Sequence, residues 1–279
     1  MNKVVSKDGT EIAYETTGTG PVVILTGAGI VGRSDYAPLA NALAARHTVY
    51  VYDRRGRGDS GNTLPYDQER EVEDIAAIVE VARGADTGEP VCLLGISSGG
   101  ALVLEAAAAG VPVDRVVVYE VPYCATEDTA SRWQNYVEGL WVALAEGREG
   151  DALELFMRFS GANDALVASA RNSPNWAGLA SVAHLLAYEA ASTGDGVPPV
   201  ARLATISQPT LVLTGSVPAN ARLGMGEMPP DFYLRASEAI VDAVPGANGL
   251  VLEGQAHEPD PVRLRSVMTD FFSGISWQL

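Results

Sequence analysis

The chain has 279 residues, of which 47% are hydrophobic, and this is enough to bury a large core in one domain. It carries 19 Lys and Arg against 35 Asp and Glu, and the formal net charge of −16 argues against a nucleic-acid partner. Residues 1–10 are polar and no long apolar segment follows, which favours a cytoplasmic protein without a signal peptide or membrane contact.

The first part of the chain alternates strand and helix patterns. Strands are predicted at residues 11–16, 21–25, 48–52, 91–94 and 113–119, and helices at 36–46, 68–83 and 97–109. Turns rich in glycine, such as residues 18–20, separate them. This alternation is typical of a doubly wound, mostly parallel sheet.

Strand patterns disappear between residues 125 and 205. Helices are predicted there around residues 133–146, 151–159 and 179–191. Strands return at residues 210–213 and 250–252, and they are followed by helices at 231–244 and 261–272. The pattern predicts an α/β core domain of residues 1–124 and 206–279 and a helical insertion of residues 125–205.

The two cysteines, Cys92 and Cys124, lie in or just beyond apolar strands and have no metal-ligand spacing. They are expected to be buried thiols rather than a disulfide scaffold or a zinc site. No metal and no cofactor are expected.

Residues 93–102 read LLGISSGGAL, an apolar strand that stops at a Gly-x-Ser-x-Gly pentapeptide and continues into an alanine-rich helix. So sharp a turn strains the central residue, and only small neighbours such as Gly95 and Gly99 leave room for it. Ser97 is therefore the predicted nucleophile, held above the sheet. Ser98 lacks this glycine frame, because Ile96 stands where a glycine is needed, so it is expected to supply a backbone amide.

Three further segments fit this turn. Residues 21–29 form a buried strand that ends in a glycine loop, residues 49–60 form a strand that enters a glycine-rich turn, and residues 250–257 place His257 after the last strand. In this order and spacing the chain resembles the α/β-hydrolase superfamily over nearly its whole length. The resemblance implies that family's fold, with residues 125–205 as a helical cap.

A serine hydroxyl becomes a good nucleophile when an imidazole removes its proton and an acid fixes the tautomer of that imidazole. His257 is the histidine placed for this role. His47 lies at a helix-to-strand junction, and His184 lies in the insertion, where it is expected to contact substrate.

The position of the acid departs from the family pattern, unlike the positions of the serine and the histidine. Most family members carry an Asp after the strand that follows the cap, but residues 215–220 contain no carboxylate. Glu120 lies 23 residues after Ser97, at a strand end where open α/β sheets place their sites. The Ser-Ser pair and the Glu-x-Pro here also resemble the fungal zearalenone lactonases, whose triad uses a Glu at this place. Glu120 is the predicted acid, and Asp231 is the alternative.

The resemblance also implies that the backbone N–H groups of Ala28 and Ser98 bind the oxyanion of a tetrahedral intermediate. Many relatives have His-Gly where this chain has Thr26-Gly27, a departure that keeps the donor. The charged residues between 53 and 60 are expected to tie loops together through buried ion pairs rather than to bind a ligand.

The insertion is rich in aromatic residues, which as a group suggest a lid over a bulky apolar substrate, although each one is at least as well explained as core. The residues predicted to contact substrate are Trp133, Trp141, Trp176, His184 and Tyr188.

The sequence therefore predicts a serine hydrolase that cleaves a carboxylic ester or lactone of a bulky apolar small molecule through an acyl-enzyme. Fold alone does not prove the reaction. The alternatives are a C–C hydrolase or a non-hydrolytic lyase or cyclase on the same scaffold, and a catalytically silent relative that binds small molecules. The only partner expected is the small-molecule substrate, and the oligomeric state stays open, with a homodimer as one alternative.

Overall fold

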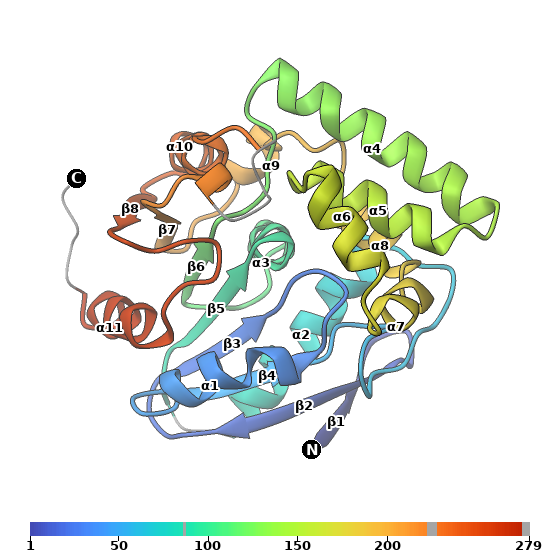
Figure 1. Ribbon diagram of the computed structural model, residues 1–279. Coiled ribbons are helices and arrows are strands. Elements are labelled where there is room, and N and C mark those ends of the chain that lie inside the picture. Colours follow the sequence, from blue (N-terminus) through green and yellow to red (C-terminus); the bar gives the residue numbers. More distant parts are fainter. Residues whose placement is uncertain (86–87, 222–227, 275–279) are drawn as a thin grey trace.

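The fold is built on an eight-stranded sheet, seen in a computed structural model that describes residues 1–85, 88–221 and 228–274 (Figure 1). The strand order is β1-β2-β4-β3-β5-β6-β7-β8. The strands are β1 (Asn2–Val5), β2 (Glu11–Thr17), β3 (Val22–Thr26), β4 (Thr48–Tyr52), β5 (Val91–Ile96), β6 (Arg115–Tyr119), β7 (Thr210–Gly215) and β8 (Asn248–Leu252). The β1–β2 and β2–β4 pairs are antiparallel and the remaining pairs are parallel, which confirms the predicted fold class.

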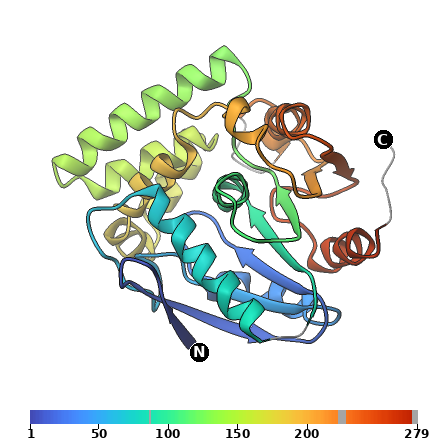
Figure 2. The same cartoon turned by 180° about the vertical axis from the view of Figure 1, so that it is seen from behind.

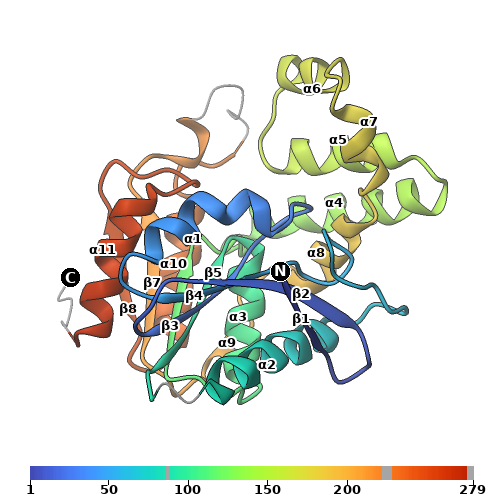
Figure 3. The ribbon, with the colours of Figure 1, turned by 90° about the horizontal axis from the view of Figure 1, so that it is seen from below.

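Helices cover both faces of the sheet (Figure 3). On one face lie α1 (Ala37–Leu43), which follows the short 3₁₀ helix η1 (Arg33–Tyr36), and α11 (Pro261–Phe272). On the other lie α2 (Gln68–Gly84), α3 (Ser98–Ala108), α9 (Val200–Leu203) and α10 (Phe232–Ala243). Because side chains alternate along a strand, Val23 and Leu25 of β3 face the first group while Val22 and Ile24 face the second.

Between β6 and β7 the described chain contains helices and no strand. These are α4 (Glu127–Ala145), α5 (Glu149–Phe159), α6 (Asp164–Arg171), α7 (Trp176–Ser181), α8 (Leu185–Thr193) and α9. Helices α4 to α8 gather at one end of the sheet (Figures 1 and 2). Side chains of α4, α5 and α8 form an apolar cluster that also includes Phe232 of α10. Helix α4 begins earlier than predicted because Thr126 caps it, its hydroxyl accepting the Thr129 N–H at 3.3 Å.

Two differences from the sequence analysis have local causes. Strand β1 was not predicted, because it is a four-residue edge strand in which only Val4 is partly buried, too short to show an alternation of apolar and polar residues. The helix predicted over residues 179–191 is divided into α7 and α8, and the break between them buries Ala183 in the core of the insertion.

Cys92 and Cys124 are both buried thiols. Burial raises the pKa of each, that of Cys124 to about 11, so both stay protonated and unreactive at neutral pH. In the part of the chain that the structure describes, no helix combines the length and the apolar character needed to cross a membrane.

Candidate active site

Ser97 occupies the sharp turn between β5 and α3. Its φ of +53° and ψ of −128° lie outside the regions that most residues adopt. A Cβ on Gly95 would come within 2.5 Å of the Gly100 Cα, and one on Gly99 would overlap the backbone carbonyls of Thr26 and Gly27. The two glycines therefore give the turn the room that the sequence predicts for it.

Glu120 and His257 meet at the adjacent strand ends. Glu120 follows β6 directly, has a φ of +47°, and is only 2% exposed. Its Oε2 lies 2.8 Å from His257 Nδ1, and its Oε1 accepts the Gly215 N–H at 2.9 Å and the Thr214 hydroxyl at 3.4 Å. Both carboxylate oxygens are thus held, and the imidazole orientation is set by Oε2.

The loop after β7, where most relatives carry the acid, packs directly on the loop that carries the histidine. A Cβ on Gly215 would overlap the Gln255 carbonyl, and the Val217 N–H donates to that same carbonyl oxygen at 3.0 Å. Asp231, the alternative acid, forms an ion pair with Arg235 one turn further along α10 and is 39% exposed. Its carboxylate is therefore paired with Arg235, and among the described residues it makes no hydrogen bond to His257.

Two tyrosines that the sequence analysis did not single out hold the histidine loop. The Tyr233 ring, on α10, stacks on the His257 imidazole with centroids 4.6 Å apart and planes at 15°. The Tyr119 hydroxyl donates to the Ala256 carbonyl. No hydrogen bond between Ser97 Oγ and His257 is present among the described residues, as is common before substrate binds, but both residues line the same cavity.

This cavity has a volume of about 700 Å³ and lies between the core and the insertion. That volume is within the range of about 300–1,000 Å³ found for small-molecule sites. The core contributes Ala28, Gly29, Tyr36, Ser97, Ser98, Phe232, Tyr233 and His257, and the insertion contributes Trp133, Tyr136, Phe156, Met157, Phe159 and Leu166. Within the described residues, no three His, Cys, Asp or Glu side chains are grouped so that they could hold a metal ion.

Of the predicted substrate contacts on the long helix α4, Trp133 lines the cavity and Trp141 does not. The two residues are eight positions apart, which rotates their side chains about 80° around a helix. Trp141 is 52% exposed, so the structure does not bring this predicted contact to the cavity. The aromatic content of a helix does not tell which face meets a ligand.

The other predicted contacts also lie away from the cavity. The Arg171 guanidinium covers the Trp176 ring at 5.4 Å. His184 is exposed, and Tyr188 is buried against Tyr66, with ring centroids 3.9 Å apart. Trp176 therefore packs within the insertion, and Tyr188 packs the insertion against the core.

The predicted oxyanion donors differ in their surroundings. Ser98 is the first residue of α3, where backbone N–H groups have no partner within the helix, and its hydroxyl donates to Glu189. The Ala28 N–H, in contrast, already donates to the Tyr36 hydroxyl oxygen at 2.7 Å. The assignment of Ala28 as a free donor is therefore not what the structure shows.

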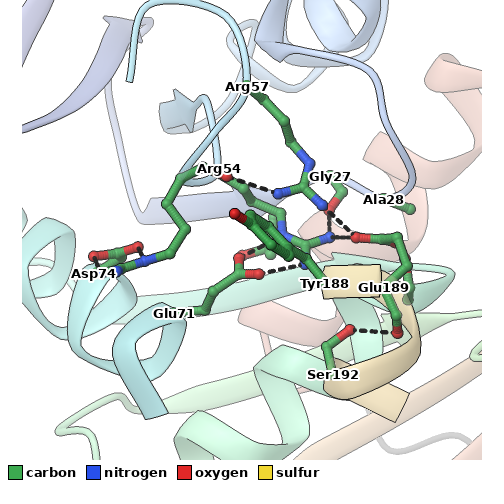
Figure 4. Close-up of polar contacts among 12 residues, drawn as sticks. Gly27, Ala28, Arg54, Arg57, Glu71, Asp74, Tyr188, Glu189 and Ser192 are labelled. Atoms are coloured by element: carbon green, nitrogen blue, oxygen red, sulfur yellow. Dashed lines mark hydrogen bonds and ion pairs between the residues drawn. The ribbon is translucent and has the colours of Figure 1, made fainter. Parts of the chain in front are cut away.

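Glu189, on α8, was missed by sequence reasoning although it lines the cavity. Its carboxylate accepts the Gly29 N–H at 2.8 Å, the Arg54 guanidinium at 2.6 Å and the Arg57 guanidinium at 2.5 Å (Figure 4). A single carboxylate in the apolar stretch LLAYEAA was the available signal. These hydrogen bonds, together with the one from the Ser98 hydroxyl, connect the insertion to the loops after β3 and β4 and to the turn at Ser97.

The charged segment after β4 forms the buried ion pairs that the sequence predicts. Arg54 binds Glu71 through two contacts of 2.7 Å, and Arg55 binds Asp74 and Asp8. Burial alone would lower the pKa of Arg54, but Glu189 and Glu71 raise it well above its ordinary value. The guanidinium stays charged and balances the carboxylates around it.

Because this network is buried, removing one charge should be costly. Glu189→Gln leaves Arg57 without its carboxylate partner, and we expect a loss of about 3 kcal/mol of stability, which lowers Tm by roughly 6–12 °C. Thermal unfolding measures this. Glu154→Gln, which removes half-exposed surface pairs to Arg158 and Arg171, is the matched control and should leave Tm nearly unchanged. Equal shifts in the two variants would contradict the expectation.

A strained serine between strand and helix, with an acid and a histidine at neighbouring strand ends, defines the α/β-hydrolase class of protein. The chain belongs to the alpha/beta hydrolase family, whose model matches residues 22–264.

Relatives agree with this assignment. The chain is similar to the crystal structure of an alpha/beta hydrolase from Sphaerobacter thermophilus DSM 20745, at 40% identity over 97% of this chain and 100% of that one, with a TM-score of 0.79. It is 30% identical, over 62% of this chain and 70% of the relative, to pimeloyl-[acyl-carrier protein] methyl ester esterase of Xylella fastidiosa (strain 9a5c). A thermophilic esterase from Thermogutta terrifontis shares the fold, at 20% identity over 98% of both chains, with a TM-score of 0.66.

Proposed function

We propose that the chain hydrolyses a carboxylic ester or lactone through an acyl-enzyme, with Ser97 as nucleophile, His257 as base and Glu120 as acid. The observation that carries the proposal is the 2.8 Å contact between Glu120 Oε2 and His257 Nδ1, made beside a cavity that Ser97 also lines. The Xylella relative is a methyl ester esterase by name, which supports an ester as the bond that is cleaved.

In this mechanism the Glu120 carboxylate accepts the Nδ1–H of His257, so that Nε2 carries the free lone pair. Nε2 takes the Ser97 proton as the hydroxyl oxygen attacks the substrate carbonyl. The tetrahedral intermediate collapses when the imidazolium gives that proton to the departing alcohol oxygen. Water, activated by the same imidazole, then attacks the acyl-enzyme and releases the acid and Ser97. In a lactone the alcohol and the acid remain parts of one product.

Substrate preference follows from the walls of the cavity. Residues 125–205 act in this proposal as a cap, because aromatic and aliphatic side chains between Trp133 and Leu166 line the same cavity as Ser97. Such a surface stabilises a bulky apolar acyl or ring group by removing it from water. Esters with small acyl groups leave most of the cavity unfilled and gain little of this binding.

We expect kcat/KM to rise with acyl or ring size, and Trp133→Leu to lower it about 10- to 100-fold for large esters while acetate esters change little. Chain-length profiles on p-nitrophenyl esters measure this. Trp141→Leu is the matched control on the same helix, because that side chain faces solvent. A profile that peaks at acetate, or equal effects of the two substitutions, would show that the cap does not select substrate.

Labelling of the purified protein by a fluorophosphonate probe tests the proposed reaction against its alternatives. A hydrolase of this type labels at Ser97 and turns over at least one ester or lactone in a broad screen. A catalytically silent binding protein does neither. A C–C hydrolase or lyase labels but leaves the esters and lactones untouched.

A further inference from the structure

In the loop that follows β3, the backbone N–H groups of Ala28 and Gly29 already donate hydrogen bonds within the protein. The Ala28 N–H donates to the Tyr36 hydroxyl oxygen at 2.7 Å, and the Gly29 N–H donates to Glu189 Oε2 at 2.8 Å and to Ser98 Oγ at 3.3 Å. An amide has one hydrogen, and a short bond to a fixed acceptor occupies it. A substrate oxygen beside Ser97 therefore needs a donor other than these two amides.

Tyr36 is held beside the loop that follows β3. It is the last residue of η1, and its ring lies so close to Gly27 that a Cβ on that residue would overlap the ring. A glycine at position 27 thus serves to admit the tyrosine. The Arg54 and Arg57 guanidinium groups hold the Gly27 and Gly29 carbonyls at 3.5 and 2.9 Å, which fixes the loop on which the tyrosine rests (Figure 4).

The Tyr36 hydroxyl can still donate one hydrogen bond. Its oxygen accepts the Ala28 N–H, and among the described residues its own O–H has no acceptor. Burial raises the pKa of Tyr36 above its ordinary value, so the hydroxyl stays protonated at neutral pH. A hydroxyl that accepts one hydrogen bond becomes a stronger donor of another, because the two bonds polarise each other.

Tyr36 also lines the cavity together with Ser97, Ser98 and His257. We propose that the Tyr36 O–H and the Ser98 N–H together bind the oxyanion, while the Ala28 N–H acts indirectly by donating to the tyrosine oxygen. Tyr36 is then a catalytic residue that touches the reacting carbonyl oxygen. This inference rests on the proposed hydrolysis through Ser97.

Tyr36→Phe separates the two arrangements, because it removes the hydroxyl and at the same time frees the Ala28 N–H. If Tyr36 is the donor, kcat/KM falls about 10²- to 10³-fold with KM nearly unchanged, as for loss of one oxyanion donor. If the Ala28 amide is the direct donor, the variant is as fast as the wild type or faster, which overturns the inference. Tyr14→Phe, on a distant strand, is the control and should change neither constant.

Two measurements keep the result interpretable if the variant is less stable. The burst of p-nitrophenol counts the folded sites, so that rates are expressed per active site. The affinity of a boronic acid, which forms a tetrahedral adduct on serine, should fall by the same factor as kcat/KM, while the affinity of the product alcohol stays constant. An unchanged boronic-acid affinity contradicts the inference. A wild type that neither labels with a fluorophosphonate nor turns over any ester overturns the proposed function, and this inference with it.

Discussion

Ser97→Ala should abolish fluorophosphonate labelling and reduce kcat by about 10⁴- to 10⁶-fold. The physical reason is that Ser97 alone occupies the strained turn, with φ of +53°, that presents a side chain to the cavity beside His257. The remaining amides and the cavity still bind substrate, so KM should change far less than kcat. Mass spectrometry of the labelled protein and steady-state kinetics measure the two effects.

Ser98→Ala is the control for this prediction. The Ser98 hydroxyl donates to Glu189 and points into the buried network, whereas the backbone N–H survives the substitution. The variant should keep labelling and most of its turnover. If Ser98→Ala loses labelling and Ser97→Ala retains it, the nucleophile is misassigned by one residue.

Glu120→Gln should lower kcat by roughly 10³- to 10⁴-fold while the protein stays folded. Oε1 accepts two hydrogen bonds, from Gly215 N–H and Thr214, so the amide oxygen is expected to take that side and turn its NH₂ group toward His257. An NH₂ group cannot accept the Nδ1–H, and the imidazole then adopts the tautomer that leaves Nε2 protonated. Kinetics together with thermal unfolding separates this loss from a loss of stability.

Asp231→Asn is the matched substitution at the other acid considered. Its carboxylate pairs with Arg235 on the surface of α10, so its loss should be nearly silent. If Asp231→Asn proves crippling and Glu120→Gln mild, the protein uses a displaced form of the usual acid, and its likeness to the zearalenone lactonases is superficial.

Local sequence patterns were sufficient to predict the fold and the sharp turn at Ser97. The alternation of buried strands with helices predicts the sheet, because each strand of a parallel sheet is apolar along its length and needs a crossover helix before the next. The need for Gly95 is equally local, because a Cβ there would overlap Gly99 and Gly100, whereas a Cβ on Gly99 would overlap the backbone of the β3 loop. The position of Glu120 at the site could also be predicted from the sequence, because parallel strands bring their carboxyl ends to one edge of the sheet.

Contacts between segments far apart in the sequence could not be predicted from local sequence patterns. Trp133 and Trp141 are the same residue type on one helix, and only the packing of α4 decides that the first faces the cavity and the second faces solvent. Glu189 binds Arg54, which lies 135 residues away in the sequence. No periodic sequence pattern predicts such a pair.

The donor arrangement shows the same division. The sequence by itself determined that a glycine loop follows β3 and lies beside the turn at Ser97, because glycines mark the ends of both strands. Only the tertiary structure decided that the Ala28 amide meets Tyr36 rather than open space, since that depends on how η1 folds back over Gly27. The pattern of buried and exposed residues depends on each segment's own sequence. The pairing of individual polar groups depends on how separate segments pack against one another.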